Sequence, residues 1–403
     1  MFKKSLVYLV LNYAIQFINI ALNLLFMRYL SSWHMGSLSL AKTWQQLVDY
    51  AHLGTRFSLD RYIPVTEDRE RVIMVASVLI FTFLSACIIF IISSISSKGD
   101  ITVVVLTLCG IGISLVNIIK CYYRACNRIN EMLMLVFRCQ FIPILAPLTI
   151  YLINHNWYSY LFSTLLCYTA SILHLLYKER KLFSDISIAA VVDSLKSISS
   201  SSAWLFANSI FIFLYLVMDR FFIDYSAGRD ILGKYSIITF AFSALMVIPS
   251  TCAELLFVKV VKQTCQSGKI FFLKESFIIV GITVAGVLCA NLVMEYFIIN
   301  FTSYEMLIPQ IHLATFAVIP FAFTSIYYHV MNGLDLRKQM VYVSGCLFIS
   351  LLIYYSILFF SNIKDNLNYY LYAKLATGWF IFMGYLLCIL LNKRKSMNGE
   401  QTN

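Results

Sequence analysis

Long uncharged apolar segments, separated by short polar connections, recur along the whole chain. Each has about 20 residues, the length at which an α-helix crosses the hydrocarbon core of a bilayer. Of the 403 residues, 60% are hydrophobic and 13% are charged, whereas a soluble domain is usually ~25% charged. We therefore predict an all-α polytopic membrane protein with twelve transmembrane helices, and the composition excludes an ordinary soluble enzyme. The predicted spans are 5–27, 36–58, 72–95, 101–120, 132–153, 157–177, 199–223, 234–257, 276–298, 307–330, 340–360 and 367–391.

Lysines and arginines are abundant in every second connection and scarce in the others. When basic residues toward the ends of the spans are counted with the nearest connection, the side of the N-terminus holds 22 of the 31 basic residues and the opposite side holds six. Arg138, Arg220 and Lys374 fall within spans. By the positive-inside rule, both termini are expected to be cytoplasmic. The net charge of +11 is mainly a topology signal, and we expect no nucleic-acid binding.

The polar connections divide the predicted spans into two groups of six. The longest connections all lie on the predicted cytoplasmic side, and the middle one separates the two groups. We therefore predict two six-helix lobes joined by a linker and followed by a cytoplasmic tail. The predicted bounds are 1–178 for the first lobe, 179–198 for the linker, 199–392 for the second lobe and 393–403 for the tail.

A weak internal repeat relates the two predicted lobes. The second span opens with Gly36-Ser37-Leu38, and the eighth opens with Gly233-Lys234-Tyr235. Each lobe begins on the cytoplasmic side and has an even number of spans, so the repeat is parallel. Parallel repeats are typical of transporters that hold their substrate between the two halves.

Polar side chains within the first, second, seventh and eighth spans recur at steps of three or four residues, which places them on one helical face. Such residues are costly against lipid, so we expect these faces to line a water-filled cavity. Interhelical hydrogen bonds, worth ~0.6 kcal/mol each, are the alternative. We call these faces polar stripes, and in the order of the four spans their residues are Ser5, Tyr8, Asn12, Gln16, Asn19 and Asn23; Lys42, Gln45, Asp49, His52 and Arg56; Asn208, Tyr215 and Asp219; and Ser236, Thr239, Ser243, Ser250 and Glu254.

Individual intramembrane charges leave alternatives open. Asp219, with Arg220 beside it, either faces the cavity or forms an ion pair that links the two lobes. The long stems of Arg138 and Lys374 allow both to snorkel to an interface. Asp49, Asp219 and Glu254 are candidates for coupling transport to an ion, a hypothesis that rests on their intramembrane positions alone.

No motif indicates catalysis, a metal or a cofactor. The segment 228–234 fits the phosphate-loop pattern GxxxxGK, but Tyr235 replaces the Ser or Thr that would hold magnesium, and no strand precedes it. The eleven cysteines lie mainly in or beside apolar runs, without the spacing of metal ligands. We therefore expect no enzyme activity, no cofactor and no metal site.

Short motifs recur in a characteristic order along the chain. They are Arg28-Tyr29-Leu30, Met35-Gly36, Leu38-Ser39-Leu40, Leu53-Gly54, Asp60-Arg61-Tyr62-Ile63-Pro64, Tyr122-Tyr123-Arg124-Ala125, Asp219-Arg220 and Gly233-Lys234-Tyr235-Ser236. Together with the twelve-span layout, they resemble the Wzx-type oligosaccharide flippases of the polysaccharide transporter family, within the MOP superfamily. The resemblance covers essentially the whole chain. The first motif departs from the family pattern, because Ser31 stands where glycine is usual.

This resemblance implies a V-shaped multi-pass transporter of the bacterial inner membrane, with spans 1, 2, 7 and 8 around a central cavity. The implied substrate is an undecaprenyl-pyrophosphate-linked oligosaccharide, moved to the periplasmic leaflet for O-antigen (lipopolysaccharide) or capsule assembly. A polysaccharide polymerase and a chain-length regulator are possible partners. Cations would hold the pyrophosphate, and amides would bind sugar hydroxyls. The cations are Arg28, Lys42, Arg56 and Arg220, and the amides are Asn12, Gln16, Asn19, Asn23 and Gln45.

Two other functions remain as alternatives. A MATE-like multidrug or cation exporter would have the same architecture, but its cavity would carry an excess of carboxylates, whereas the second span carries two cations and one acid on its stripe. A polysaccharide polymerase is less favoured. It would be expected to have a large periplasmic loop, and the predicted outer connections have only about 3 to 12 residues.

Overall fold

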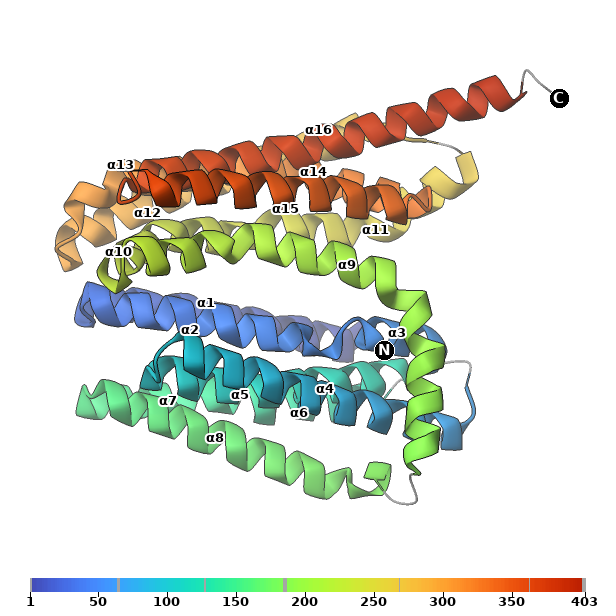
Figure 1. Ribbon diagram of the computed structural model, residues 1–403, viewed down its shortest axis with the longest axis horizontal. Helices are drawn as coiled ribbons and strands as arrows, with labels where there is room; N and C mark the ends of the chain where they lie inside the picture. Colours follow the sequence, from blue (N-terminus) through green and yellow to red (C-terminus); the bar gives the residue numbers. More distant parts are fainter. Residues whose placement is uncertain are drawn as a thin grey trace. The chain divides into compact units, whose positions relative to one another are not determined.

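The computed structural model describes residues 2–63, 66–126, 128–183, 187–267, 269–361 and 363–400, and every regular element within these ranges is a helix (Figure 1). In the described part of the chain, ten helical segments are long and apolar enough to cross a membrane. The shorter apolar stretch Ala14–Tyr29 belongs to the first helix. The predicted all-α polytopic fold is therefore confirmed.

The chain divides into two compact units. Unit 1 comprises Met1–Phe26 and Ser37–Phe206, and unit 2 comprises Met27–Gly36 and Ala207–Asn403. Three segments are assigned differently from the predicted lobes. Residues 27–36 of the predicted first lobe belong to unit 2, whereas the predicted linker 179–198 and residues 199–206 of the predicted second lobe belong to unit 1. The boundary between the units falls inside α9 (Ile188–Ser226), so one continuous helix contributes to both.

The elements up to α9 are α1 (Phe2–Tyr29), α2 (Ser32–Asp49), η1 (Tyr50–His52), α3 (Thr55–Tyr62), α4 (Asp68–Ser96), α5 (Ile101–Ala125), α6 (Ile129–Val136), η3 (Phe137–Phe141), α7 (Ile142–Asn154), α8 (Trp157–Lys178) and η4 (Arg180–Phe183). Those after α9 are α10 (Arg229–Leu245), α11 (Val247–Ser267), α12 (Leu273–Phe301), η5 (Glu305–Leu307), α13 (Ile308–Phe316), α14 (Val318–Gly333), α15 (Arg337–Phe360) and α16 (Leu367–Glu400).

Helix α5 is the most buried of the long apolar helices that the structure describes in unit 1. It packs against α4 and α8, and these helices run side by side in Figure 1. Two glycines allow this close packing, as small residues commonly do between membrane helices. A Cβ on Gly112 would lie 1.9 Å from Cδ1 of Ile172 on α8, and one on Gly110 would lie 3.1 Å from the backbone oxygen of Gln45 on α2. Helix α5 is therefore the central helix of unit 1.

Helix α14 has the corresponding place in unit 2. It packs against α12 and α16, as α5 packs against α4 and α8. A Cβ on Gly378 of α16 would lie 2.7 Å from Cβ of Pro320 on α14, so a small residue is again required at the crossing. The same helix contacts thus recur in the same chain order in both units, as the predicted parallel repeat requires.

Two glycines that the sequence repeat aligns with each other, Gly36 and Gly233, are in direct contact within unit 2. A Cβ on Gly36 would lie 2.0 Å from the backbone oxygen of Arg229, and one on Gly233 would lie 1.8 Å from that of Ser32. Each oxygen belongs to the residue four positions before the opposite glycine, so the contact is reciprocal. Beside it, Ser32 Oγ donates a hydrogen bond of 2.7 Å to Oδ1 of Asp230. The first turns of α2 and α10 therefore cross with their backbones in direct contact, because glycine has no side chain to separate them.

The predicted second span, an uninterrupted helix over 36–58, is wrong because the chain breaks after Asp49. Leu53 and Gly54 adopt left-handed conformations, with φ of 43° and 89°. The break is stabilised locally: Nδ1 of buried His52 accepts a hydrogen bond from the Gly54 N–H at 2.9 Å, and the Thr55 hydroxyl donates to the His52 carbonyl at 2.6 Å. His52 is consequently a turn residue and does not continue the polar stripe of α2.

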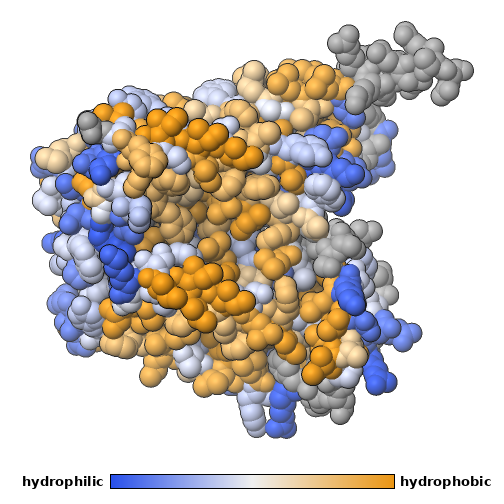
Figure 2. Space-filling model, viewed as in Figure 1, coloured by the Kyte–Doolittle hydropathy of each residue, from blue (hydrophilic) through white to orange (hydrophobic). Residues whose placement is uncertain are grey.

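The outer faces of the helices are strongly apolar. Figure 2 shows hydrophobic side chains over the middle parts of the helices and hydrophilic ones near their ends. On α4, the large side chains of Ile88, Ile91, Ile92 and Ile95 are all exposed. Apolar faces of this extent are not found on water-soluble monomers. They suit contact with lipid, as expected of a multi-pass membrane protein.

Candidate functional site

A lysine and an asparagine from two of the striped helices meet in unit 1. Lys42 Nζ on α2 donates a hydrogen bond to Asn23 Oδ1 on α1, with 2.7 Å between the atoms. Asn23 Nδ2 in turn donates to the backbone oxygen of Asn19 at 2.6 Å. Asn23 is thus held with its amide oxygen toward the ammonium group. The structure brings together three of the residues that the sequence predicted for substrate binding.

Asp49 and Arg56 form a second polar cluster in unit 1, across the break in the second span. Arg56 NH1 lies 3.0 Å from Asp49 Oδ1 and 3.1 Å from Oδ2, and both side chains are partly exposed. Asn117 on α5 donates to the same Asp49 Oδ1 at 2.9 Å. The carboxylate of Asp49 is therefore neutralised by an arginine and also held by the central helix.

Sequence reasoning missed Asn117 and Gln140 at this cluster. Gln140 Nε2, in the π-helical segment η3, lies 3.4 Å from Asn117 Oδ1 and extends the network from α5 to the next predicted span. In the sequence, each of these residues is a single amide within an otherwise apolar predicted span. Neither span has a polar stripe, so no periodicity identified these residues as partners of Asp49.

A buried ion pair occupies the interior of unit 2. Lys374 Nζ on α16 lies 2.5 Å from Asp219 Oδ2 on α9, and it also donates to the backbone oxygen of Leu216 at 3.0 Å. Tyr235 OH on α10 donates to the same Asp219 oxygen at 2.5 Å. The relative exposure is 0% for Asp219 and 4% for Lys374. The snorkelling of Lys374 that the sequence allowed is wrong, because its ammonium group points into the unit.

Aromatic rings surround this ion pair. Tyr355 and Tyr370 are stacked with centroids 5.5 Å apart, and Tyr235 meets Tyr370 edge-on at 6.2 Å. All three tyrosines are buried. The shell excludes water, so each charge depends on its partner and on neighbouring hydrogen bonds. Asp219 is therefore a neutralised group that connects α9, α10 and α16.

The other predicted cations lie in separate surroundings. Arg28 is exposed, and its guanidinium carbon lies 5.2 Å from the ring centroid of Tyr29 and 5.4 Å from that of Phe301. Arg220 is half-buried and donates its backbone N–H to Asp219 Oδ1 at 2.8 Å. Both belong to unit 2, whereas Lys42 and Arg56 belong to unit 1. The four cations therefore divide equally between the two units.

The remaining predicted side chains have varied positions. Gln16 on α1 is exposed, and Gln45 on α2 is half-buried, with its backbone beside Gly110 of α5. Asn12 and Glu254 lie in helices, but their side chains are outside the described residues. The binding and coupling roles of all these residues stay predictions.

Two of the striped faces are satisfied by hydrogen bonds within the protein. On α10 the hydroxyls of Ser236, Thr239 and Ser243 each donate to a carbonyl three or four residues earlier in the same helix. Ser344 Oγ on α15 donates to Oδ1 of buried Asn208 on α9 at 3.0 Å. For these residues, the observed contacts are hydrogen bonds within and between helices, which was the alternative to lining a water-filled cavity.

No family model matches the sequence, and no curated protein matches it either. Among solved structures, the chain is similar to an inward-facing multidrug resistance MATE family transporter of the MOP superfamily. The TM-score is 0.58 at 13% identity, covering 96% of this chain and 95% of the other. The chain shares the fold of this transporter. A MATE protein in the straight conformation also matches, with a TM-score of 0.46, 14% identity and coverage of 97% of this chain and 94% of that chain.

This shared fold is consistent with the twelve-helix arrangement expected from the sequence. The second of these helices is the one broken between α2 and α3. At this level of identity the similarity establishes the fold and leaves the substrate open. The charged clusters of the two units therefore provide the information on the chemistry of the substrate.

Proposed function

We propose that this chain is an alternating-access transporter that flips undecaprenyl-pyrophosphate-linked oligosaccharides from the cytoplasmic to the periplasmic leaflet of a bacterial inner membrane. Both termini would be cytoplasmic. The product would enter O-antigen or capsule assembly, with a polysaccharide polymerase and a chain-length regulator as partners. Flipping breaks no bond, so the proposal requires no catalytic residue, metal or cofactor.

The observation that carries this proposal is the pairing of the acidic residues. Asp49 is neutralised by Arg56 in unit 1, and Asp219 is neutralised by Lys374 in unit 2. A transporter of cationic drugs needs carboxylates that can accept the drug's charge. Here both acids already have a basic partner, and Lys42 donates a hydrogen bond to the amide oxygen of Asn23. This balance favours an anionic substrate.

The cluster of Asn19, Asn23 and Lys42 suits the chemistry of the proposed substrate. An ammonium group binds a phosphate as a point charge. The nearby amides can exchange hydrogen bonds with sugar hydroxyls. Because Arg56 is balanced by Asp49, we assign the larger part of pyrophosphate recognition in unit 1 to Lys42, with Arg28 and Arg220 contributing from unit 2.

The membrane potential is sufficient to bias such a transport step. Moving one elementary charge across 100 mV is worth ~2.3 kcal/mol. Outward movement of a pyrophosphate diester with about two negative charges would thus gain ~4.6 kcal/mol from an inside-negative potential. ATP hydrolysis is not needed. Ion coupling through Asp49, Asp219 or Glu254 would add to this, although the first two acids are already engaged in ion pairs.

A MATE-like multidrug or cation exporter is the second candidate. It is favoured by the structural similarity, since the matched protein is a multidrug resistance MATE transporter. In that case the substrate would have to displace Arg56 from Asp49 or Lys374 from Asp219. Displacing the second pair would be costly, because it would leave a buried lysine unpaired.

Replacing Arg28, Lys42 and Arg220 together with glutamine is expected to reduce flipping at least ~tenfold, because even one charge-assisted hydrogen bond is worth ~1.5–3 kcal/mol. Flipping would be measured in proteoliposomes as the exposure of a labelled undecaprenyl-pyrophosphate oligosaccharide to an external glycosidase. Arg337→Gln is the matched control, since Arg337 begins α15 and pairs with the exposed Asp335.

The same vesicles distinguish the two candidates. A flippase moves the labelled lipid and does not accumulate a fluorescent organic cation, whereas a drug exporter does the reverse. Wild-type flipping rates in the triple variant would refute the assigned cations. Transport of the cation alone would refute the flippase.

A further inference from the structure

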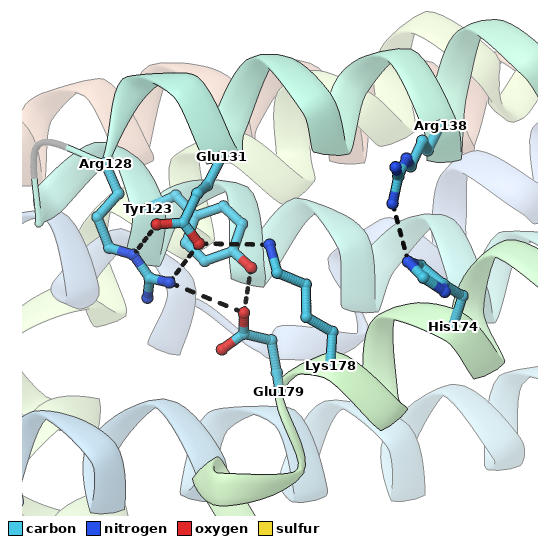
Figure 3. A network of polar contacts seen from close by, with 7 residues as sticks. All are labelled: Tyr123, Arg128, Glu131, Arg138, His174, Lys178 and Glu179. Carbon is cyan, nitrogen blue, oxygen red and sulfur yellow. Dashed lines mark hydrogen bonds and ion pairs between the residues drawn. The ribbon is translucent and has the colours of Figure 1, made fainter.

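A cluster of charged residues lies where α5, α6 and α8 have their predicted cytoplasmic ends, away from the polar stripes of α1 and α2. Arg128, just before α6, forms an ion pair with Glu131, lies 3.9 Å from Glu179 and stacks over the ring of Tyr123. Tyr123 OH donates to Glu179, and Lys178 Nζ lies 3.3 Å from Glu131 Oε2 (Figure 3). Both carboxylates of the cluster are therefore engaged by cations.

Arg138 lies deeper in the same region, and among the residues that the structure describes no carboxylate pairs with it. Its NH1 lies 2.9 Å from Nε2 of His174 on α8, and Figure 3 shows the two side chains pointing toward each other. A guanidinium group can only donate, so His174 Nε2 accepts and its Nδ1 carries the proton. Among the described residues, Arg138 forms no ion pair with an acid. Together with Arg128 and Lys178, it leaves the cluster with three cations against two carboxylates.

The backbone around Arg138 is specialised. Arg138 lies in the π-helical segment η3, between α6 and α7. Such bulges within α-helices are frequent at functional sites. Ser171 Oγ on α8 donates to the Arg138 carbonyl at 3.1 Å, and Cys139 Sγ lies 3.9 Å from the Ser171 carbonyl. The segment is thus held against α8 by contacts at Arg138 and at Cys139, which fix the backbone that carries the guanidinium group.

Arg138 and His174 border a small pocket whose other lining residues include Glu131, Met134 and Lys178. The surface beside the pocket is apolar, with exposed fractions of 48% for Met134, 43% for Phe137, 62% for Leu173 and 70% for Tyr177. Positive donors in the pocket therefore lie next to a surface suited to acyl chains. Basic pockets between transmembrane helices on the cytoplasmic side bind the head groups of anionic lipids.

We propose that Arg138, His174 and Lys178 form a binding site for the phosphate of an anionic bilayer phospholipid in the cytoplasmic leaflet. Arg138 donates its remaining N–H groups to phosphate oxygens, His174 donates from Nδ1, and Lys178 supplies a point charge at the rim. The acyl chains lie against Met134, Phe137 and Leu173. This lipid would be resident on the outer face of unit 1, so the proposal does not depend on which substrate is transported.

The test is a titration of the purified full-length protein in detergent with phosphatidylglycerol, with bound copies counted by native mass spectrometry. We expect one saturable site with clear preference over phosphatidylcholine. Arg138→Gln should weaken it roughly tenfold, the effect of losing a charge-assisted hydrogen bond. His174→Gln should weaken it less, because one donor is changed and the charge of Arg138 remains. If Arg138→Gln does not yield folded protein, His174→Gln still tests the site.

Arg337→Gln is the matched control, since it removes one exposed cation at the same predicted side in unit 2. Equal weakening by Arg337→Gln and Arg138→Gln would indicate diffuse surface charge and overturn the site. If inorganic phosphate binds as tightly as phosphatidylglycerol, the site recognises free phosphate, and the proposal that its ligand is a phospholipid is refuted. Equal binding of phosphatidylcholine would overturn the selectivity for anionic lipid.

Discussion

Replacing Lys374 with methionine is expected to lower the free energy of unfolding by ~3–5 kcal/mol, the usual cost of removing one partner from a buried ion pair. Methionine keeps most of the volume but leaves the carboxylate of Asp219, which is 0% exposed, without its cation. Tyr235 and the Arg220 N–H would still donate to that carboxylate, but neither carries a charge to balance it. The measurement is reversible unfolding of the purified protein in mixed micelles.

The double variant Lys374→Met with Asp219→Leu tests whether the pairing itself causes the loss. Replacing a whole buried ion pair with apolar residues is often neutral or stabilising. We therefore expect the double variant to be more stable than Lys374→Met alone. Arg337→Met, which breaks the exposed pair with Asp335, should change stability by less than ~1 kcal/mol. A double variant as unstable as the sum of its two single variants would show that the two charges are not coupled.

Substituting Gly233 with alanine is expected to destabilise the protein by about 3 kcal/mol, at the upper end of the range for overpacking. The added Cβ would lie 1.8 Å from the backbone oxygen of Ser32, and this backbone atom cannot rotate away. Helices α2 and α10 would have to separate, which would also strain the hydrogen bond between Ser32 and Asp230. Gly36→Ala should have a similar effect, because the contact is reciprocal.

Gly281→Ala on α12 is the matched control for this prediction. No atom lies within 4 Å of a Cβ added at Gly281, and alanine favours a helix by up to ~1 kcal/mol relative to glycine. The control should therefore be as stable as the wild type or slightly more stable. The readouts are the yield of monodisperse protein and its unfolding midpoint. A Gly233→Ala protein as stable as the Gly281→Ala protein would contradict the contact.

The sequence indicated which helix faces are polar, but it did not indicate which residues contact them. The steps of three and four residues placed Asn23 and Lys42 on the faces by which α1 and α2 meet. Periodicity identifies a face, but it carries no information on which helix faces it. Asp219 was expected to face a cavity or to form an ion pair that links the two lobes, whereas its cation is Lys374, 155 residues later in the chain and within the same unit. Asn117 was missed because a single amide has no period.

The sequence by itself determined the membrane-spanning helical fold and the order of helices that repeats in its two halves. The reason is that bilayer thickness sets the length of each apolar run, and repeat motifs align along the chain without reference to tertiary contacts. Only the tertiary structure decided where the second span breaks, which charges neutralise each other and that the aligned glycines touch. These features depend on contacts between residues far apart in sequence, where packing and the cost of burying a charge select one partner among many.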